Sequence, residues 1–80
     1  MIENWHHLIS AIGDTYLANE IGVTTKTLNR WINRYYNVPP RHFKSIYMTA
    51  FDCGHTGITI KMLGNFNLKL AQEKSERELI

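Results

Sequence analysis

The sequence predicts an all-α fold, a small four- or five-helix bundle. Two observations predict it: apolar residues recur at helical spacing in successive segments, and glycine or proline marks the boundaries between these segments. Eighty residues form one domain with a modest core, and an apolar content of 44% is enough for a compact globule. We expect residues 1–66 to form this domain, and residues 67–80 to form an extra C-terminal helix or a tail.

The first helix is expected over residues 3–12, and Gly13 ends it. Asp14 or Thr15 can cap a second helix, which is expected over residues 15–21. Apolar residues of the first helix fall at i, i+3, i+4 and i+7, so they share one face. These residues are Trp5, Leu8, Ile9 and Ile12.

The segment 14–33 predicts two short helices that cross steeply through a tight turn. Ala18 is small enough for the second of these helices to pack against the first, and Gly22 lies where the chain leaves the first, a place that favours a left-handed backbone. This arrangement is a helix-turn-helix, whose second helix is a candidate for insertion into a DNA major groove. Four apolar residues are expected to close a wedge between the two helices: Leu17, Ile21, Leu28 and Ile32.

The second helix of this motif is expected to run from a Thr24 cap to about Tyr35. Its outward face carries no acid and no large apolar residue, and its cationic and amide side chains suit the edges of bases. The inward residues are Leu28, Trp31, Ile32 and Tyr35, and the outward residues are Lys26, Asn29, Arg30 and Asn33.

A proline-containing loop is expected at residues 36–40, followed by a helix over residues 41–53. Gly54 and Gly57 interrupt this helix. Residues 57–62 could then form a short strand because they include β-branched side chains, or residues 59–63 could form a short helix. One face of the helix over 41–53 is expected to carry Phe43, Ile46, Tyr47, Ala50 and Phe51.

The positive charge of the chain is concentrated in one segment. Residues 1–25 carry a net charge of −3, residues 26–44 carry +5 and residues 45–80 carry 0, so the whole chain has +2. The positive segment comprises the second helix of the motif and the chain that follows it. Excess positive charge in such a place is typical of a surface that meets DNA phosphates.

Two segments resemble the Cro-type helix-turn-helix regulators of phages and prophages: LANEIGVTTKTLNRWI and YNVPPRHFKSI. The resemblance covers about residues 14–50. It implies a sequence-specific transcriptional regulator, a small repressor that occupies double-stranded operator DNA as a homodimer. Asp14 departs from the pattern, because such proteins often place a DNA-contacting glutamine there and an acid would repel phosphate.

Charge, helical face and motif position together divide the expected DNA contacts into two sets. The expected base contacts are Thr25, Lys26, Asn29, Arg30 and Asn33. The expected phosphate contacts are Thr24, Thr15, Thr27, Arg34, Arg41 and Lys44.

Two other interpretations stay open. The same helical scaffold could serve as a protein-interaction module, or the chain could be a recombination accessory or an antitoxin-like protein. Such accessories often carry a β-wing, and residues 54–66 are the only place for one here. That segment carries a single base, Lys61, which makes the accessory interpretation less favourable.

We expect no enzymatic activity, metal, cofactor or small-molecule substrate. The histidines and Cys53 match no structural zinc spacing, and no nucleophile has a visible base and third group. With one cysteine no intrachain disulfide can form, which fits the reducing cytoplasm of a prokaryotic or phage-infected cell. No membrane partner is expected, because no apolar stretch approaches the length that spans a bilayer.

Overall fold

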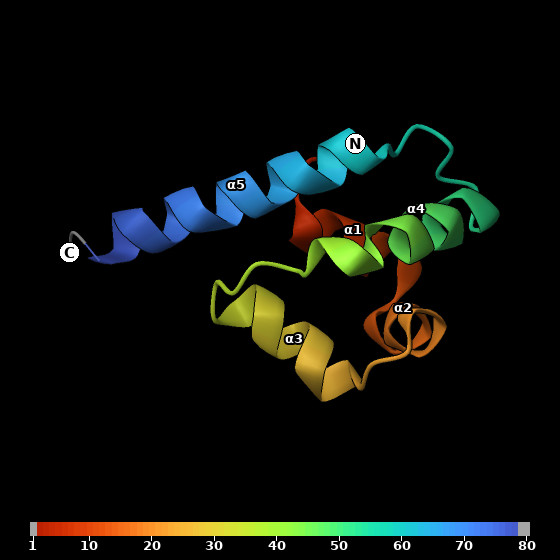
Figure 1. The fold of residues 1–80 in the computed structure, drawn as a ribbon, viewed down its shortest axis with the longest axis horizontal. Coiled ribbons are helices and arrows are strands. Elements are labelled where there is room, and N and C mark those ends of the chain that lie inside the picture. Colours follow the sequence, from red (N-terminus) through yellow and green to blue (C-terminus); the bar gives the residue numbers. More distant parts are fainter. Residues whose placement is uncertain (1, 79–80) are drawn as a thin grey trace.

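Five α-helices and one short 3-10 helix form the computed structural model, which describes residues 2–78 (Figure 1). No strand occurs within these residues, so the predicted all-α fold is confirmed. Of the two structures considered around residues 57–63, a helix is the one observed, but it runs over Ile60–Glu78 and is not the short helix expected over residues 59–63. The elements in chain order are α1 (Trp5–Ile12), α2 (Asp14–Ile21), α3 (Thr25–Asn33), η1 (Pro40–His42), α4 (Phe43–Asp52) and α5 (Ile60–Glu78).

A side-chain cap and two residues with positive φ explain both ends of α1 and the end of α3. α1 begins at Trp5 because Asn4 caps it, its Oδ1 accepting a hydrogen bond from the backbone N–H of His7 at 2.9 Å. Gly13, with a φ of 101°, ends α1 as predicted. α3 ends at Asn33 rather than at about Tyr35, because Tyr35 adopts a left-handed φ of 59° that interrupts the helix.

α2 and α3 form the predicted helix-turn-helix. Figure 1 shows α2 nearly end-on while α3 lies across the picture, so the two helices cross steeply. Gly22 has the left-handed φ of 81° that the turn requires, and the N–H of Val23 donates to the carbonyl of Ala18 at 3.0 Å. Ala18 and the four residues of the predicted wedge are buried, which confirms the wedge: Leu17, Ile21, Leu28 and Ile32.

The orientation of α4 differs from the prediction. Phe51, expected on the inward face, is 52% exposed, whereas Thr49 is only 6% exposed. The buried face of α4 is centred between Ile46 and Ala50, which leaves Phe51 at its edge. Thr49 can be buried because its hydroxyl donates to the carbonyl of Ser45 at 2.8 Å.

Of the two tryptophans expected in the core, Trp5 is buried and Trp31 is only partly buried. The ring of Trp5 packs edge-on against Phe66, with centroids 5.5 Å apart. Tyr35, also expected to face inward, is likewise partly buried and packs against the edge of the core. The core therefore depends more on Trp5 than on the aromatic residues of α3 and its end.

α5 is one continuous helix that crosses the expected boundary between residues 66 and 67. Leu63, Phe66 and Leu70 are buried, so both sides of that boundary contribute to the core. Figure 1 shows the C-terminal half of α5 reaching beyond the other helices. Residues 79–80 of the expected tail lie outside the described residues. Within the described residues, no helix has both the length and the apolar character needed to cross a membrane.

Asn67 connects α5 with two other segments. Its Oδ1 accepts hydrogen bonds from Nε1 of Trp5 and from the backbone N–H of Val38, and its Nδ2 donates to the carbonyl of Val38, each at 3.0 Å. Val38 and Trp5 are both buried. This one side chain thus fixes α1, α5 and the loop between α3 and η1 relative to one another.

Candidate nucleic-acid interface

α3 presents a basic face without acids to solvent. Lys26, Arg30 and Asn33 are exposed, and their steps of four and three residues place them on one face of the helix. The opposite face contains the two buried residues of α3, Leu28 and Ile32. Because this packing fixes the rotation of α3, it also fixes the direction in which the basic face points.

A shallow hollow of about 560 Å³ lies between the N-terminal end of α2 and the start of α3. It brings together three threonines that the sequence predicts as DNA contacts. It also includes Tyr16 and Asn19, which sequence reasoning missed. The helical spacing of polar residues along α2, at i and i+3, could have found them. The residues around the hollow are Thr15, Tyr16, Asn19, Val23, Thr24 and Thr25.

The hollow has hydrogen-bond donors from two sources. Tyr16 is 49% exposed, and the carboxylate of Glu20, followed by Cys53, raises the pKa of its hydroxyl, so it keeps its proton at neutral pH. Helix geometry leaves the first backbone amides of α3, those of Thr25 and Lys26, without an intrahelical acceptor. Donors of both kinds suit an anion such as a phosphate.

Thr24 caps α3 as predicted. Its Oγ1 accepts a hydrogen bond from the backbone N–H of Thr27 at 3.1 Å and donates one to the Thr27 hydroxyl at 2.9 Å. The cap therefore joins two of the predicted phosphate-contacting residues and holds the first turn of α3 in place.

Asn29 differs from the other predicted base-contacting residues, because it is partly buried and bonded to α2. Its Nδ2 donates to Oδ2 of Asp14 at 3.1 Å. Oδ1 of Asp14 accepts a hydrogen bond from the backbone N–H of Thr15 at 2.7 Å. These bonds, with that from Asn29 first, lower the pKa of Asp14 below its usual 3.8, so its carboxylate is ionised at neutral pH. Both carboxylate oxygens of Asp14 thus have partners within the protein.

Arg41 and Lys44 lie on neighbouring elements, η1 and the first turn of α4, and both are exposed. The rings of Trp31 and His42 lie 5.5 Å apart at an angle of 33°, which places η1 against α3. Burial, with a smaller effect of Arg41, lowers the pKa of His42, so this histidine adds no charge at neutral pH. The positive segment of the sequence is thus divided between α3 and the adjacent η1–α4 corner.

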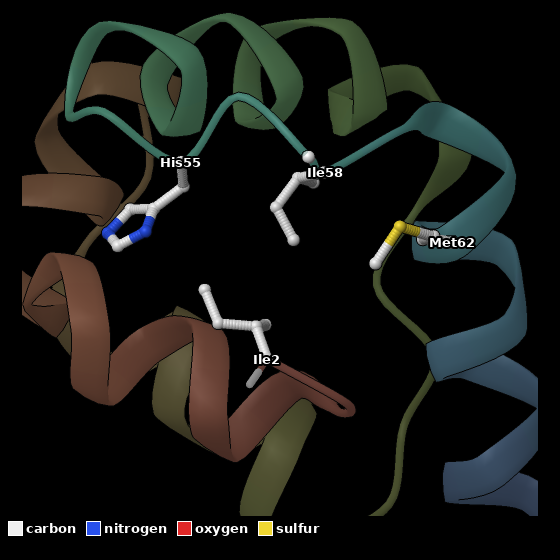
Figure 2. A pocket seen from close by; sticks show the side chains of 5 residues that line it. Ile2, His55, Ile58 and Met62 are labelled. Carbon is white, nitrogen blue, oxygen red and sulfur yellow. The ribbon is translucent and has the colours of Figure 1, made fainter.

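A second hollow, of about 410 Å³, lies at the end of the domain remote from α3, where the N-terminal segment meets the loop after α4 and the start of α5. Figure 2 shows Ile2, Ile58 and Met62 around this hollow, with His55 as the one labelled polar side chain. Within residues 2–78, no three or more His, Cys, Asp or Glu residues gather where they could hold a metal ion. Most of the predicted site residues instead lie around α2 and α3.

Comparisons with models of protein families, with curated proteins and with solved structures found no match. The resemblance to Cro-type regulators therefore stays a prediction. What the chain does is inferred from the surface that α2, α3 and the η1–α4 corner present.

Proposed function

We propose that this chain is a sequence-specific DNA-binding transcriptional regulator, a small Cro-like repressor of phage or prophage type that acts by occupying its operator. The observation that supports this most directly is the outward face of α3, where Lys26, Arg30 and Asn33 are exposed together on a helix fixed by its buried side. Side chains of these types complement base edges in the major groove. The helix also occupies the second position of a helix-turn-helix, the position that enters the groove.

In this proposal the base contacts come from α3. Arg30 and Lys26 donate to guanine, and Thr25 and Asn33 reach bases near the two ends of the helix. Each good bidentate contact discriminates against the wrong base by about 1–3 kcal/mol. The fifth predicted base contact, Asn29, would read its base while it stays bonded to Asp14.

The phosphate contacts would lie on both sides of this helix. On one side, a phosphate in the hollow between α2 and α3 would meet Thr15, Thr24 and the first amides of α3, with Thr27 next to them. On the other side, Arg34, Arg41 and Lys44 are exposed and would hold the flanking backbone. Such contacts position the protein on the duplex and carry no direct sequence information.

We further propose that the repressor binds as a homodimer, with the two α3 helices in half-sites about 34 Å apart. Two observations support a self-association surface. Met48 and Phe51 on α4 are 53% and 52% exposed, and Leu68 on α5 is 63% exposed. Met48 and Phe51 also line one hollow on α4, so they form a contiguous apolar patch, and such patches are typical of surfaces that another protein covers.

The competing interpretations are less well supported. A protein-interaction module would not need the basic, acid-free face of α3. A recombination accessory would be favoured by a wing in residues 54–66, but this part of the described chain contains a loop and the first turns of α5 and no strand. The homodimer and the DNA target therefore remain the partners we propose.

Two DNA titrations test the proposal. At low salt, the purified protein is expected to shift a mixed-sequence duplex, and selection from a random duplex pool is expected to enrich one two-fold symmetric site. No shift with the mixed duplex, together with tight association to a protein partner, would favour the interaction module instead. A shift without any enriched sequence would exclude a sequence-specific regulator.

Replacing Lys44 by alanine is expected to weaken binding to every duplex and to flatten the salt dependence. One lost phosphate contact changes the slope of log K against log salt by about one unit. The matched control is Lys61→Ala, which removes an exposed lysine at the start of α5, remote from α3 (Figure 1). Affinities measured by fluorescence anisotropy between low and moderate salt give both slopes. Equal slopes for Lys44→Ala and the wild type would remove Lys44 from the contact set.

A further inference from the structure

We propose that Asp14 is a positioning residue, which fixes the amide of Asn29 and so determines which base this side chain reads. The inference rests on the proposed function, because it concerns a residue of the helix that would enter the groove. Asp14 belongs to α2 and Asn29 to α3, fifteen residues further along the chain. Their hydrogen bond thus joins the two helices of the motif at the edge of the basic face.

The chemistry of this pair allows only one orientation of the amide. An ionised carboxylate accepts hydrogen bonds and cannot donate one, so only the NH₂ group of Asn29 can face Asp14. The bond of 3.1 Å runs from Nδ2 of Asn29 to Oδ2 of Asp14, while Oδ1 of Asp14 is engaged by the backbone N–H of Thr15. The bond from the backbone N–H of Thr15 holds the carboxylate of Asp14 in place. Asp14 therefore determines the rotation of the Asn29 amide.

A fixed amide presents its carbonyl oxygen away from Asp14. In the major groove a carbonyl oxygen is complementary to an exocyclic amino group, which adenine offers at N6 and cytosine at N4. Guanine and thymine offer acceptor oxygens at the corresponding places, which a carbonyl oxygen would repel. The carbonyl oxygen of Asn29 is therefore expected to select adenine or cytosine, and adenine also offers N7 as an acceptor for the second N–H of the amide, which Asp14 does not use. A free asparagine, which can turn its NH₂ group outward, would not make this distinction.

The same bond explains how an acid is tolerated beside DNA. Asp14 is an acid at the edge of the basic face, yet both its oxygens accept hydrogen bonds from the protein. Its carboxylate acts on the DNA through Asn29 rather than by contacting a phosphate. A neutral amide at this position would remove the charge and also release the constraint, so the two effects must be separated by controls.

The test compares binding-site selection for the wild type, Asp14→Asn, Asn29→Ala and the double variant. The wild type is expected to prefer adenine or cytosine at one operator position by about tenfold. Asp14→Asn is expected to reduce this preference to about twofold at that position alone, because an asparagine at 14 can donate or accept and lets the amide of Asn29 turn. In the Asn29→Ala background, Asp14→Asn is expected to change no base preference.

Glu20→Gln is the matched control for loss of charge, since Glu20 is an exposed carboxylate on the same helix. A general gain in affinity shared by Asp14→Asn and Glu20→Gln is a charge effect, whereas relaxed selection at one position is not. Circular dichroism melting shows that each variant is folded, and Asn29→Ala identifies the position independently of any change at residue 14.

The outcomes separate the positioning role of Asp14 from the proposed DNA-binding function. If Asp14→Asn relaxes the position that Asn29→Ala also relaxes, the positioning role stands. If Asp14→Asn selects the wild-type base there, or Asn29→Ala affects no position, the positioning role is wrong while the DNA-binding function stands. If the wild type selects no sequence, the proposed function fails, and the positioning role fails with it.

Discussion

Arg30→Ala is expected to weaken binding to the selected operator by about tenfold to a hundredfold while leaving the melting temperature almost unchanged. Arg30 is exposed on the outward face of α3, so its loss removes no core contact. Alanine is also the best helix former, so the recognition helix keeps its structure. A bidentate arginine–guanine contact discriminates by about 1–3 kcal/mol, and each 1.4 kcal/mol corresponds to a factor of ten in affinity.

Arg30→Lys serves as the matched control for this prediction. Lysine keeps the positive charge but lacks the planar fork that makes two parallel hydrogen bonds to guanine. This variant is expected to keep its binding to mixed-sequence duplex and to lose less operator affinity than Arg30→Ala, because lysine can still donate to guanine and the other base contacts remain. Fluorescence anisotropy with operator and mixed duplexes, alongside thermal melting, measures both quantities. Operator binding by Arg30→Ala as tight as that of the wild type would show that α3 does not read the groove as proposed.

The helix-turn-helix could be predicted because its determinants are local. Ala18, Gly22 and the apolar wedge lie within 16 residues, from Leu17 to Ile32, and each has a conformational or packing requirement that few residue types meet. The structure accordingly places Gly22 in the left-handed conformation and buries Ala18. The outward positions of Lys26, Arg30 and Asn33 follow from the same helical periodicity.

The rotation of α4 could not be predicted in the same way. Its apolar residues cover a wide arc, from Ile46 and Ala50 round to Tyr47, Met48 and Phe51, so periodicity alone does not determine which part faces inward. Packing against the other helices selects the first part and leaves Met48 and Phe51 exposed. Tertiary packing therefore overrides the apolar pattern, and the burial of Thr49 depends on a hydrogen bond that the pattern does not express.

The exposed cations of the site could be predicted from the sequence, but the hydrogen bond between Asn29 and Asp14 could not. Exposed cations on α3 follow from position and charge, but the bond between Asn29 and Asp14 depends on how two helices meet across the turn. A helical wheel places Asn29 simply on the outward face, whereas the structure places it at the edge, partly buried. The i, i+3 spacing of Tyr16 and Asn19 places both on one face of α2, but the hollow they border exists only once α2 and α3 are assembled.

Asn67→Ala is expected to lower the free energy of unfolding by about 3 kcal/mol. The substitution removes three hydrogen bonds and leaves Nε1 of Trp5 and both backbone groups of Val38 without these partners. Each such bond contributes about 1 kcal/mol, and a buried group left without a partner costs about 1–3 kcal/mol. The higher helix propensity of alanine offsets only about 0.5 kcal/mol of this loss. For a domain of this size the melting temperature should fall by about 15 °C.

Asn65→Ala gives the matched comparison, because Asn65 is exposed on the same helix and gains the same helix propensity. Its free energy of unfolding is expected to equal that of the wild type or to exceed it slightly. Urea denaturation followed by circular dichroism measures both variants under one set of conditions. A difference of less than about 1 kcal/mol between them would contradict the role of Asn67, since one net hydrogen bond alone contributes about that much. A larger difference would show that the side chain of Asn67 joins α5 to α1 and to the loop that leads from α3 into η1. Asn67 would then stabilise the part of the fold that positions the η1–α4 corner.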